Sequence, residues 1–504
     1  MKKVTLSLGV LAALLAAVAG LGPLYTSQIA NREIASAVTA INQQGLFEAR
    51  YVAGTHGWFS QSDTLTLKPV ERRWPDTQRR LRQAIVLHLH IAYGPLPFAA
   101  WARDGVSLMP VGAVIDTRVE GLDRILSRAD SGYRLHDVVT LGASNTFTLQ
   151  VDAGHMTNRN GLQMRWSQSN LVLMQSGQRL HGHGRSGTLT VDDTGPLRTH
   201  LQIDPITLDI DHLHIVDGQA IGKMALSWGG FDARNFPNKS RPPQDVRLGE
   251  LRMSVDSHLS GGIAAGQGTM SLSKLVVRQH GDTGTPQFAL NGVEISSSTT
   301  DPKDGYADSS MSWNLKQFDM NGDQYSPAGL TVEMNHLYVP ALIDTMRTLR
   351  EAEHRLQPQG GEPPKQAMQR LFGLLIPSAQ VLLAHEPVLR LSGLRLGTPQ
   401  GILTGQGEAR LEPANGATPS VTTLPQDLVA SLKLSAPPSL ARHLATLFLA
   451  RQGVPVYQLA QASQRYLDNL RNQGFLSMRE GNYALDLGYG HGSLTFNGKE
   501  IGVR

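Results

Sequence analysis

The residues with the clearest chemical potential in this chain are histidines paired across a single intervening residue. In a β-strand, residues i and i+2 lie on one face, so each pair could present two imidazoles to a transition metal. A third ligand would have to come from elsewhere in the chain. We therefore interpret the pairs as solvated faces of amphipathic strands, and we expect no metal and no cofactor. The pairs are His88/His90, His181/His183 and His212/His214, the last preceded by the alternating Asp209 and Asp211.

Two short motifs of known enzymes occur in the wrong setting. Residues 182–187 match G-x-G-x-x-G, but residues 188–191 read as a strand, whereas phosphate binding needs a helix N-terminus after the glycines. Ser271 and Lys274 match S-x-x-K, which requires one helical turn between them, yet they lie in strand-like sequence. The chain has no cysteine, which excludes thiolate catalysis, disulfides and zinc–thiolate sites. We expect no catalytic residue and a non-enzymatic protein.

Basic residues gather most densely just before a predicted strand, around Trp74. In a membrane-anchored protein, such a cluster could contact anionic headgroups or lipopolysaccharide phosphates. A solvated loop is the simpler interpretation. The net charge of +4 is otherwise spread over 504 residues, which argues against a nucleic-acid partner. The cluster consists of Arg72, Arg73, Arg79, Arg80 and Arg82.

The N-terminus has the features of a membrane segment. Lys2 and Lys3 precede residues 4–24, which carry no charge and are long enough to span a bilayer at about 1.5 Å per residue. Cleavage after Ala19 would release a soluble periplasmic protein. The apolar run exceeds a usual signal core of about 7–15 residues, which favours an uncleaved anchor. We expect a single-pass bacterial inner-membrane protein with a periplasmic ectodomain, and a juxtamembrane helix over residues 25–45.

Alternating apolar residues dominate residues 46–338. Leu251, Met253 and Val255 are one example of the period of two, and Gly, Asn, Asp and Pro clusters separate such runs. This pattern predicts an antiparallel β ectodomain with one apolar face, and the absence of βαβ alternation argues against a doubly wound sheet. Residues 231–245 and 412–425 have the composition of loops.

Helical periodicity appears in two later blocks. The spacing predicts a helical insert over residues 339–380, then residues 381–504 with strands, a helical pair and a closing hairpin that turns at Asn497-Gly498. A short strand is expected at residues 381–383. The fold class is thus mainly β (α+β), an extended, curled antiparallel sheet with amphipathic helices packed on it, preceded by one transmembrane helix.

Four features occur in order along the chain. The first is the Lys-Lys anchor with the helix that follows it, and three short motifs come after it: His56, Gly57, Trp58 and Phe59, then Gly94, Pro95 and Pro97, and finally Asn497 and Gly498. With these features the chain resembles the YdgA/YihF-like family of Gram-negative envelope proteins of unknown function, with Tyr93 in place of the family's usual histidine. The resemblance implies an anchored, β-rich periplasmic protein and carries over no activity. Locally, the Gly-Pro pair predicts a sharp turn, and the Trp-Phe pair predicts a core contact or, as the alternative, a membrane-proximal aromatic anchor.

Three functions of different class remain open. The first is a non-enzymatic factor of envelope biogenesis that binds a partner protein. The second is a conduit that binds lipids or other amphiphiles on a curved β-sheet. The third, with the least support, is a metal-dependent hydrolase built on the His and Asp residues. The observation that separates the first two is whether the helices at residues 339–375 and 440–470 cover the apolar sheet face.

Overall fold

The structure, a computed structural model, describes most of the chain beyond residue 46. Residues 1–30, with the predicted anchor at 4–24, lie outside the described residues. Within the described part, no helix is both long enough and apolar enough to cross a membrane. The described residues are 47–501 except 58–59, 71–83, 94–110, 121–130, 141–143, 158–160, 194, 196–197, 217–218, 239–240, 283, 356–372, 374–375, 378 and 414–422, together with Asn31, Ile34, Ala35, Val38, Thr39, Ile41 and Asn42.

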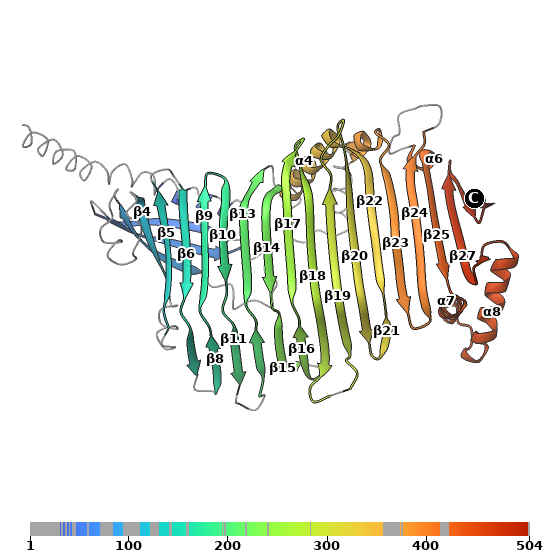
Figure 1. The fold of residues 1–504 in the computed structure, drawn as a ribbon, viewed down its shortest axis with the longest axis horizontal. Helices are drawn as coiled ribbons and strands as arrows, with labels where there is room; N and C mark the ends of the chain where they lie inside the picture. The colour runs from blue at the N-terminus through green and yellow to red at the C-terminus, as the bar shows by residue number, and fades with distance from the viewer. Residues whose placement is uncertain are drawn as a thin grey trace, which may run out of the picture. The chain divides into compact units, whose positions relative to one another are not determined.

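The described chain is mainly β, with few helices, which confirms the predicted class (Figure 1). It divides into two units. The first unit comprises residues 1–214 and 226–229, and the second comprises residues 215–225 and 230–504. Strand β14 (Gln219–Trp228) has residues in both units.

The first unit contains a meandering antiparallel sheet in which most neighbours in space are also neighbours in sequence. Such a sheet follows from short turns between strands that each have one apolar face. The sheet consists, in order, of β1 (Phe47–His56), β2 (Ser60–Pro69), β3 (Ile85–Tyr93), β4 (Val111–Val119), β5 (Tyr133–Thr140), β6 (Ser144–Val151), β9 (Ser169–Ser176), β10 (Arg179–Arg185) and β13 (Ile206–Val216).

A shorter antiparallel ladder completes the first unit. It places a strand directly after the glycine-rich residues 182–187, as the sequence predicted, so that motif has no helix N-terminus for a phosphate. The ladder consists of β7 (Gly154–Thr157), β8 (Leu162–Trp166), β11 (Leu189–Asp193) and β12 (His200–Ile203).

The core of the first unit lies between its first strands and a helical segment. The described residues between 31 and 42 are helical, and Ile34 packs with its side chain only 8% exposed. Asn42 fixes this segment to β1, because its side chain accepts the Ala49 N–H at 2.7 Å and donates to the Ala49 carbonyl at 3.1 Å. The buried cluster consists of Ile34, Leu89, Ile91, Tyr93, Ala113, Ile115 and Val139.

The second unit is built around one long antiparallel ladder. Strand β16 (Arg241–Leu248) joins it by pairing with β18, and β15 (Phe231–Asn238) pairs with β16. Two short strands, β21 (Asp323–Tyr325) and β26 (Ser477–Arg479), pair with β20 and β27. The ladder consists, in order, of β17 (Leu251–Ser260), β18 (Ile263–Gln279), β19 (Phe288–Thr299), β20 (Tyr306–Met320), β22 (Ala328–Tyr338), β23 (Val388–Thr398), β24 (Gly401–Leu411), β25 (Leu428–Ala436), β27 (Asn482–Gly490), β28 (Ser493–Phe496) and β29 (Lys499–Ile501).

Two local predictions were wrong. The described residues of 231–245, expected as a loop, form β15 and the first part of β16, because their polar and proline residues are accommodated by an irregular register with bulges. Residues 381–383, expected as a strand, are helical. A run of three apolar residues does not distinguish the two conformations by periodicity. Most of the predicted loop 412–425 and of the second helical stripe at 368–375 lies outside the described residues.

The described helices of the second unit pack at two separate places. Helix α4 (Val339–Arg355) follows β22 directly, and Val339 is buried with Ile263 and Ala307. Helices α7 (Pro438–Arg451) and α8 (Val456–Asn472) pack on each other and on Tyr483 of β27. A single turn, α6 (Leu424–Asp427), precedes β25. The helices α4, α7 and α8 begin close to the positions that the apolar periodicity predicts.

Candidate functional site

The strand register of the second unit aligns apolar side chains on one side of the ladder. Residues directly opposite each other in an antiparallel pair share a face. Met253 lies opposite Met270, Met270 opposite Ile295, and Ile295 opposite Trp313. We call this side the apolar face; it runs over nine strands from β17 to β27. It includes Leu251, Met253, Met270, Leu272, Val293, Ile295, Met311, Trp313, Leu315, Leu330, Val332, Met334, Leu389, Leu391, Leu394, Leu396, Leu403, Leu432, Leu434, Leu485 and Leu487.

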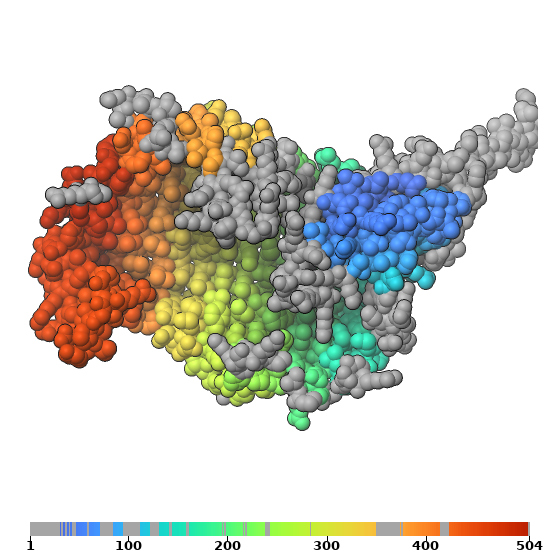
Figure 2. Space-filling view, turned by 180° about the vertical axis from the view of Figure 1, so that it is seen from behind, coloured from blue at the N-terminus to red at the C-terminus, as the bar shows by residue number. Residues whose placement is uncertain are grey.

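Water reaches most of the apolar face. Met311, Met334 and Leu389 are 41%, 44% and 46% exposed, and none of the residues that define the face is buried. Two clusters of buried residues in this unit lie instead below α4 and beside α7. In Figure 2 the yellow and orange strands form a hollowed surface beside the red α7–α8 pair. Helices α4, α7 and α8 therefore bury residues near the margins of the apolar face, and the face residues between them are partly exposed.

The opposite face of the same ladder is polar. Ser296 and Ser312 form a cross-strand hydrogen bond of 2.7 Å, and Arg390 pairs with Glu408 at 2.9 Å. These residues alternate with the apolar ones along their strands, so the two faces differ there. Toward the other end of β18, β19 and β20 the same side also carries apolar residues, because Leu275 lies opposite Leu290 and Leu290 opposite Phe318. A charged, hydrogen-bonded face is suited to water. The sheet is thus amphipathic, and its exposed apolar side is the unusual one.

At its C-terminal end the apolar face continues into a cavity of about 280 Å³. Helices α7 and α8 form one wall and the sheet forms the other. Nearly all lining atoms are apolar, and Leu444 and Phe448 of α7 are about half exposed, at 48% and 46%. The volume approaches that of small-molecule pockets, which begin at about 300 Å³. The lining includes Leu403, Leu434, Leu485, Leu444, Phe448 and Tyr466.

A buried polar network lies within the core of the first unit. Gln61 and Asp63 of β2 are only 2% and 3% exposed. The Asp63 carboxylate accepts hydrogen bonds from the Tyr51 hydroxyl, from the Gln61 amide at 2.6 Å and from the Gly54 N–H at 2.9 Å. The Tyr93 hydroxyl donates to the Gln61 side-chain carbonyl. The network therefore joins β1, β2 and β3 through one carboxylate.

The electrostatics of this network favour uncharged tyrosines. Burial, followed by the nearby Asp63 carboxylate, raises the pKa of Tyr93 to about 12. Burial and the hydrogen bond to Asp63 also raise the pKa of Tyr51 far above its usual value. A phenol held neutral is a hydrogen-bond donor and a poor base. The network is thus a structural element of the core. Its sequence signal is two polar residues on the apolar stripe of β2, which continues with Leu65 and Leu67.

The three His-x-His pairs have different surroundings. His88 and His90 are exposed and alternate with the buried Leu89 and Ile91, so the predicted polar strand face is confirmed. His90 Nδ1 lies 3.3 Å from the Ser62 hydroxyl of the adjacent strand.

The other two pairs meet across β10 and β13. His181 Nδ1 lies 3.4 Å from Asp211 Oδ1, and His212 Nε2 lies 3.5 Å from the same oxygen. One histidine from each of the two pairs thus lies beside the same carboxylate, that of Asp211. The sequence pattern instead grouped the two histidines of a single pair. His183 lies opposite Asp209, and His214 Nδ1 lies 3.2 Å from the His212 carbonyl.

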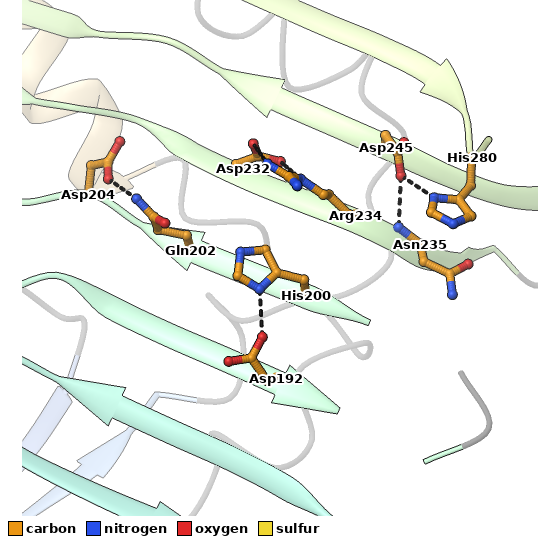
Figure 3. Close-up of polar contacts among 9 residues, drawn as sticks. All are labelled: Asp192, His200, Gln202, Asp204, Asp232, Arg234, Asn235, Asp245 and His280. Atoms are coloured by element: carbon orange, nitrogen blue, oxygen red, sulfur yellow. Dashed lines mark hydrogen bonds and ion pairs between the residues drawn. The ribbon is translucent and has the colours of Figure 1, made fainter. Parts of the chain in front are cut away.

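Two further polar contacts of the first unit lie on its shorter ladder (Figure 3). His200 Nδ1 approaches Asp192 Oδ1 to 2.6 Å across the β11–β12 pair. The Gln202 amide donates to Asp204 at 2.8 Å. These contacts link neighbouring polar side chains and satisfy part of their hydrogen-bonding capacity.

In the second unit, Asp245 organises an irregularity of β15 (Figure 3). Its Oδ1 accepts the Asn235 N–H at 2.8 Å and lies 2.7 Å from His280 Nδ1. Burial acts to raise the pKa of Asp245, but the Asn235 N–H and His280 together outweigh it, and the pKa lies below its usual value. Arg234 and Asp232 form a neighbouring ion pair at 3.0 Å. Both contacts stabilise the bulged strand.

Only some motif residues fall in the described chain. His56 ends β1, and the Gly57 N–H donates to the Ser60 carbonyl at 2.7 Å, which forms the turn into β2. Asn497 and Gly498 form the expected hairpin turn, both with positive φ, at 46° and 79°. The remaining sequence-predicted site residues lie outside the described residues: Trp58, Phe59, Gly94, Pro95 and Pro97, and the basic cluster Arg72, Arg73, Arg79, Arg80 and Arg82.

Asn497 also ties the end of the ladder to the chain after α8. Its side-chain amide donates to the carbonyls of Gly474 and Phe475, at 3.2 and 2.8 Å, and its carbonyl accepts the Asp486 N–H at 3.1 Å. The turn residue is thereby also a tertiary contact.

The order of motifs predicted a family of bacterial proteins of unknown function that extends over the whole chain. A family model does match residues 1–504. No curated protein and no solved structure matches the chain. The fold and surface described above are therefore the basis for any functional statement. The chain belongs to the family described as bacterial protein of unknown function (DUF945).

Proposed function

We propose that this chain is a non-enzymatic lipid-binding protein of the bacterial envelope, and that the apolar face of the second unit holds acyl chains. The observation that carries the proposal is that no residue of this face is buried over nine strands, and that Met334 and Leu389 on its middle strands, β22 and β23, are more than 40% exposed. At about 4.8 Å between strands, the face is roughly 40 Å long. That length exceeds the hydrocarbon thickness of a bilayer, which is about 30 Å.

The energetics favour a bound apolar partner. Burying a Leu or Met side chain fully is worth about 1.5–3 kcal/mol, so each half-exposed side chain leaves roughly 1 kcal/mol to be gained. Occupation of several positions would give several kcal/mol. Exposed patches of this kind are rare on soluble proteins unless they bind something. Unbranched methionines, such as Met253 and Met270, adapt to chains of variable shape.

The chemistry of the face argues for acyl chains rather than a folded protein. A protein interface usually carries about one hydrogen bond per 100–200 Å². The apolar face offers side chains of Leu, Met, Val, Ile and Trp, and its backbone groups are engaged in the ladder on both sides. A partner with no need for hydrogen bonds matches this surface best. The polar heads of such lipids would remain in water at the margins of the sheet.

The proposal includes the location of the protein. Lys2, Lys3 and the uncharged residues 4–24 support an inner-membrane anchor, with the remainder of the chain in the periplasm. The resemblance to the YdgA/YihF-like proteins supports the same location. An anchor of this kind would hold the apolar face close to a source of lipid. The anionic-lipid role of Arg72–Arg82 stays a prediction.

Site-specific photo-crosslinking of the full chain in its own bacterium tests the proposal. A photoreactive amino acid is placed at Val332 on the apolar face or at the adjacent Thr331 on the polar face. After irradiation, mass spectrometry of the purified adducts identifies the attached molecule. We expect lipid adducts at Val332 and few at Thr331. Leu391 and Arg390 form a second matched pair, one strand away.

Each alternative result has a definite meaning. A single protein adduct at Val332 would support the partner-binding function instead. Equal lipid yields at Val332 and Thr331 would indicate general membrane proximity and would refute a specific face. The absence of any adduct at Val332, with an efficient reaction at Thr331, would show that other parts of the chain cover the face.

A further inference from the structure

The pairing of β10 with β13 contains a bulge at three residues that can bind metals. Leu180 lies opposite Leu213 and Gly182 lies opposite Ile210, so His181 alone faces two residues, Asp211 and His212. In a regular strand, adjacent side chains point to opposite faces. The extra residue changes the direction of one of them, so that Asp211 and His212 both approach His181.

The distances within this cluster suit one metal ion. Asp211 Oδ1 lies 3.4 Å from His181 Nδ1 and 3.5 Å from His212 Nε2. All the ligand atoms lie within 4.8 Å of one another. A tetrahedral Zn²⁺ with bonds of about 2.0–2.1 Å separates its ligands by about 3.3 Å. The two imidazoles are in edge-to-face contact with ring centres 3.9 Å apart.

The backbone of His212 is held in an unfavourable conformation. Its φ is 53°, in the left-handed region that a residue with a Cβ adopts only at a cost. Two bulges of the second unit have the same feature, at Asn235 (φ 54°) and His336 (φ 59°). In each, an aspartate opposite the bulge, Asp245 or Asp308, accepts the N–H of that residue at 2.8 Å.

The bulge of β13 departs from that pattern. The opposing residue is His181, and the carboxylate belongs to Asp211 within the bulge itself. The imidazole of His181 thus occupies the position at which the other two bulges have an aspartate that accepts the backbone N–H. Strained residues persist where the surroundings or a ligand compensate the strain, and they cluster at functional sites.

The geometry points to a metal site: we propose that His181, Asp211 and His212 bind one divalent transition-metal ion. Two imidazoles and one carboxylate suit Zn²⁺ and its neighbours, whereas Ca²⁺ and Mg²⁺ prefer oxygen ligands. The side chains of His181, Asp211 and His212 are 30%, 61% and 59% exposed, so the ion can enter and water can complete its coordination. The site is independent of the apolar face.

Calorimetric titration of the full chain in lipid nanodiscs, without an affinity tag, with ZnCl₂ at pH 7.5 tests the proposal. We expect one site per chain, and we expect His181→Ala or Asp211→Asn to weaken binding at least tenfold. His183→Ala is the matched control, because it removes a histidine from the same strand, and it should bind as the parent does. At pH 5.5 binding should weaken, since imidazoles must lose their protons to bind metal.

The variant His212→Gly separates a metal site from a structural cluster. Glycine tolerates positive φ, so without metal this variant should melt at a higher temperature than the parent. With Zn²⁺ the parent should melt at a higher temperature than His212→Gly, because only the parent gains stability by binding the metal. An equal loss of Zn²⁺ affinity in His183→Ala and His181→Ala would mean adventitious binding by exposed histidines. That result, or no binding by the parent, would overturn the proposal.

Discussion

The core of the first unit and the apolar face of the second arise from the same alternation of apolar and polar residues. In the first unit a helical segment supplies Ile34 and Val38, and Ile91 and Val139 become fully buried. In the second unit α4, α7 and α8 bury residues only near the margins of the face, and Leu389 stays 46% exposed. Alternation therefore predicts which face of a sheet is apolar. It does not predict whether that face is a core or a binding surface.

Inserting a charge should have the largest effect and tests this comparison directly. Val139→Asp places a carboxylate in a fully buried site and should cost several kcal/mol, enough to unfold the first unit. Val332→Asp on the apolar face should cost about 1 kcal/mol or less, because water can solvate it. Hydrogen exchange of β5 and β22 measures the two effects separately. Equal damage at both sites would mean that the apolar face is a covered core.

High pH should weaken the first unit. The pKa of Tyr93 is about 12 in the folded chain and about 10 when unfolded. A raised pKa gives stability that is fully present below pH 10 and is lost as the pH rises toward 12. At 1.36 kcal/mol per pH unit, the loss is roughly 2–3 kcal/mol. Circular dichroism during alkaline titration measures it. Tyr93→Phe should reduce this dependence, and an unchanged curve would contradict the buried position of the hydroxyl.

Asn497→Ala should loosen the end of the ladder that carries the apolar face. The variant loses the hydrogen bonds to Gly474, Phe475 and Asp486 and places alanine at positive φ. We expect a loss of about 1–3 kcal/mol. Asn497→Gly tolerates the positive φ but lacks the side-chain hydrogen bonds, so its stability should lie between that of the parent and that of Asn497→Ala. If glycine matches the parent, the side chain contributes nothing. Thermal unfolding provides the comparison.

Acid should have the smallest effect, at the bulge of β15. The pKa of Asp245 in the folded chain lies below its usual value. The carboxylate therefore contributes to stability above its pKa in the unfolded chain, about 4, and this contribution is lost as the pH falls through its pKa in the folded chain. The side chain is one-third exposed, and we expect less than about 1 kcal/mol. Thermal unfolding of Asp245→Asn and the parent at pH 7 and pH 3 should show a larger difference at pH 7 than at pH 3.

The strands and helices with long, regular periodicity were predictable, as β17 and α7 show. The strand at residues 231–238 was not predictable, because a bulge at Arg234 and Asn235 breaks the apolar–polar alternation by which a strand is predicted. The candidate sites were harder still. His181 meets Asp211 and His212 only because two strands pair with a particular register shift. Such registers depend on turns and bulges throughout the sheet, and no local pattern specifies them.

The apolar face contains four methionines, Met253, Met270, Met311 and Met334, on successive or nearby strands. The face is partly open to water, so an oxidant can reach their thioethers. Conversion to the sulfoxide turns a flexible apolar side chain into a polar one. Oxidative stress would therefore make the surface progressively wetter, and reductases that repair methionine sulfoxide would restore it. The same exposure on which the proposed lipid binding depends also makes this sheet a target for chemical damage.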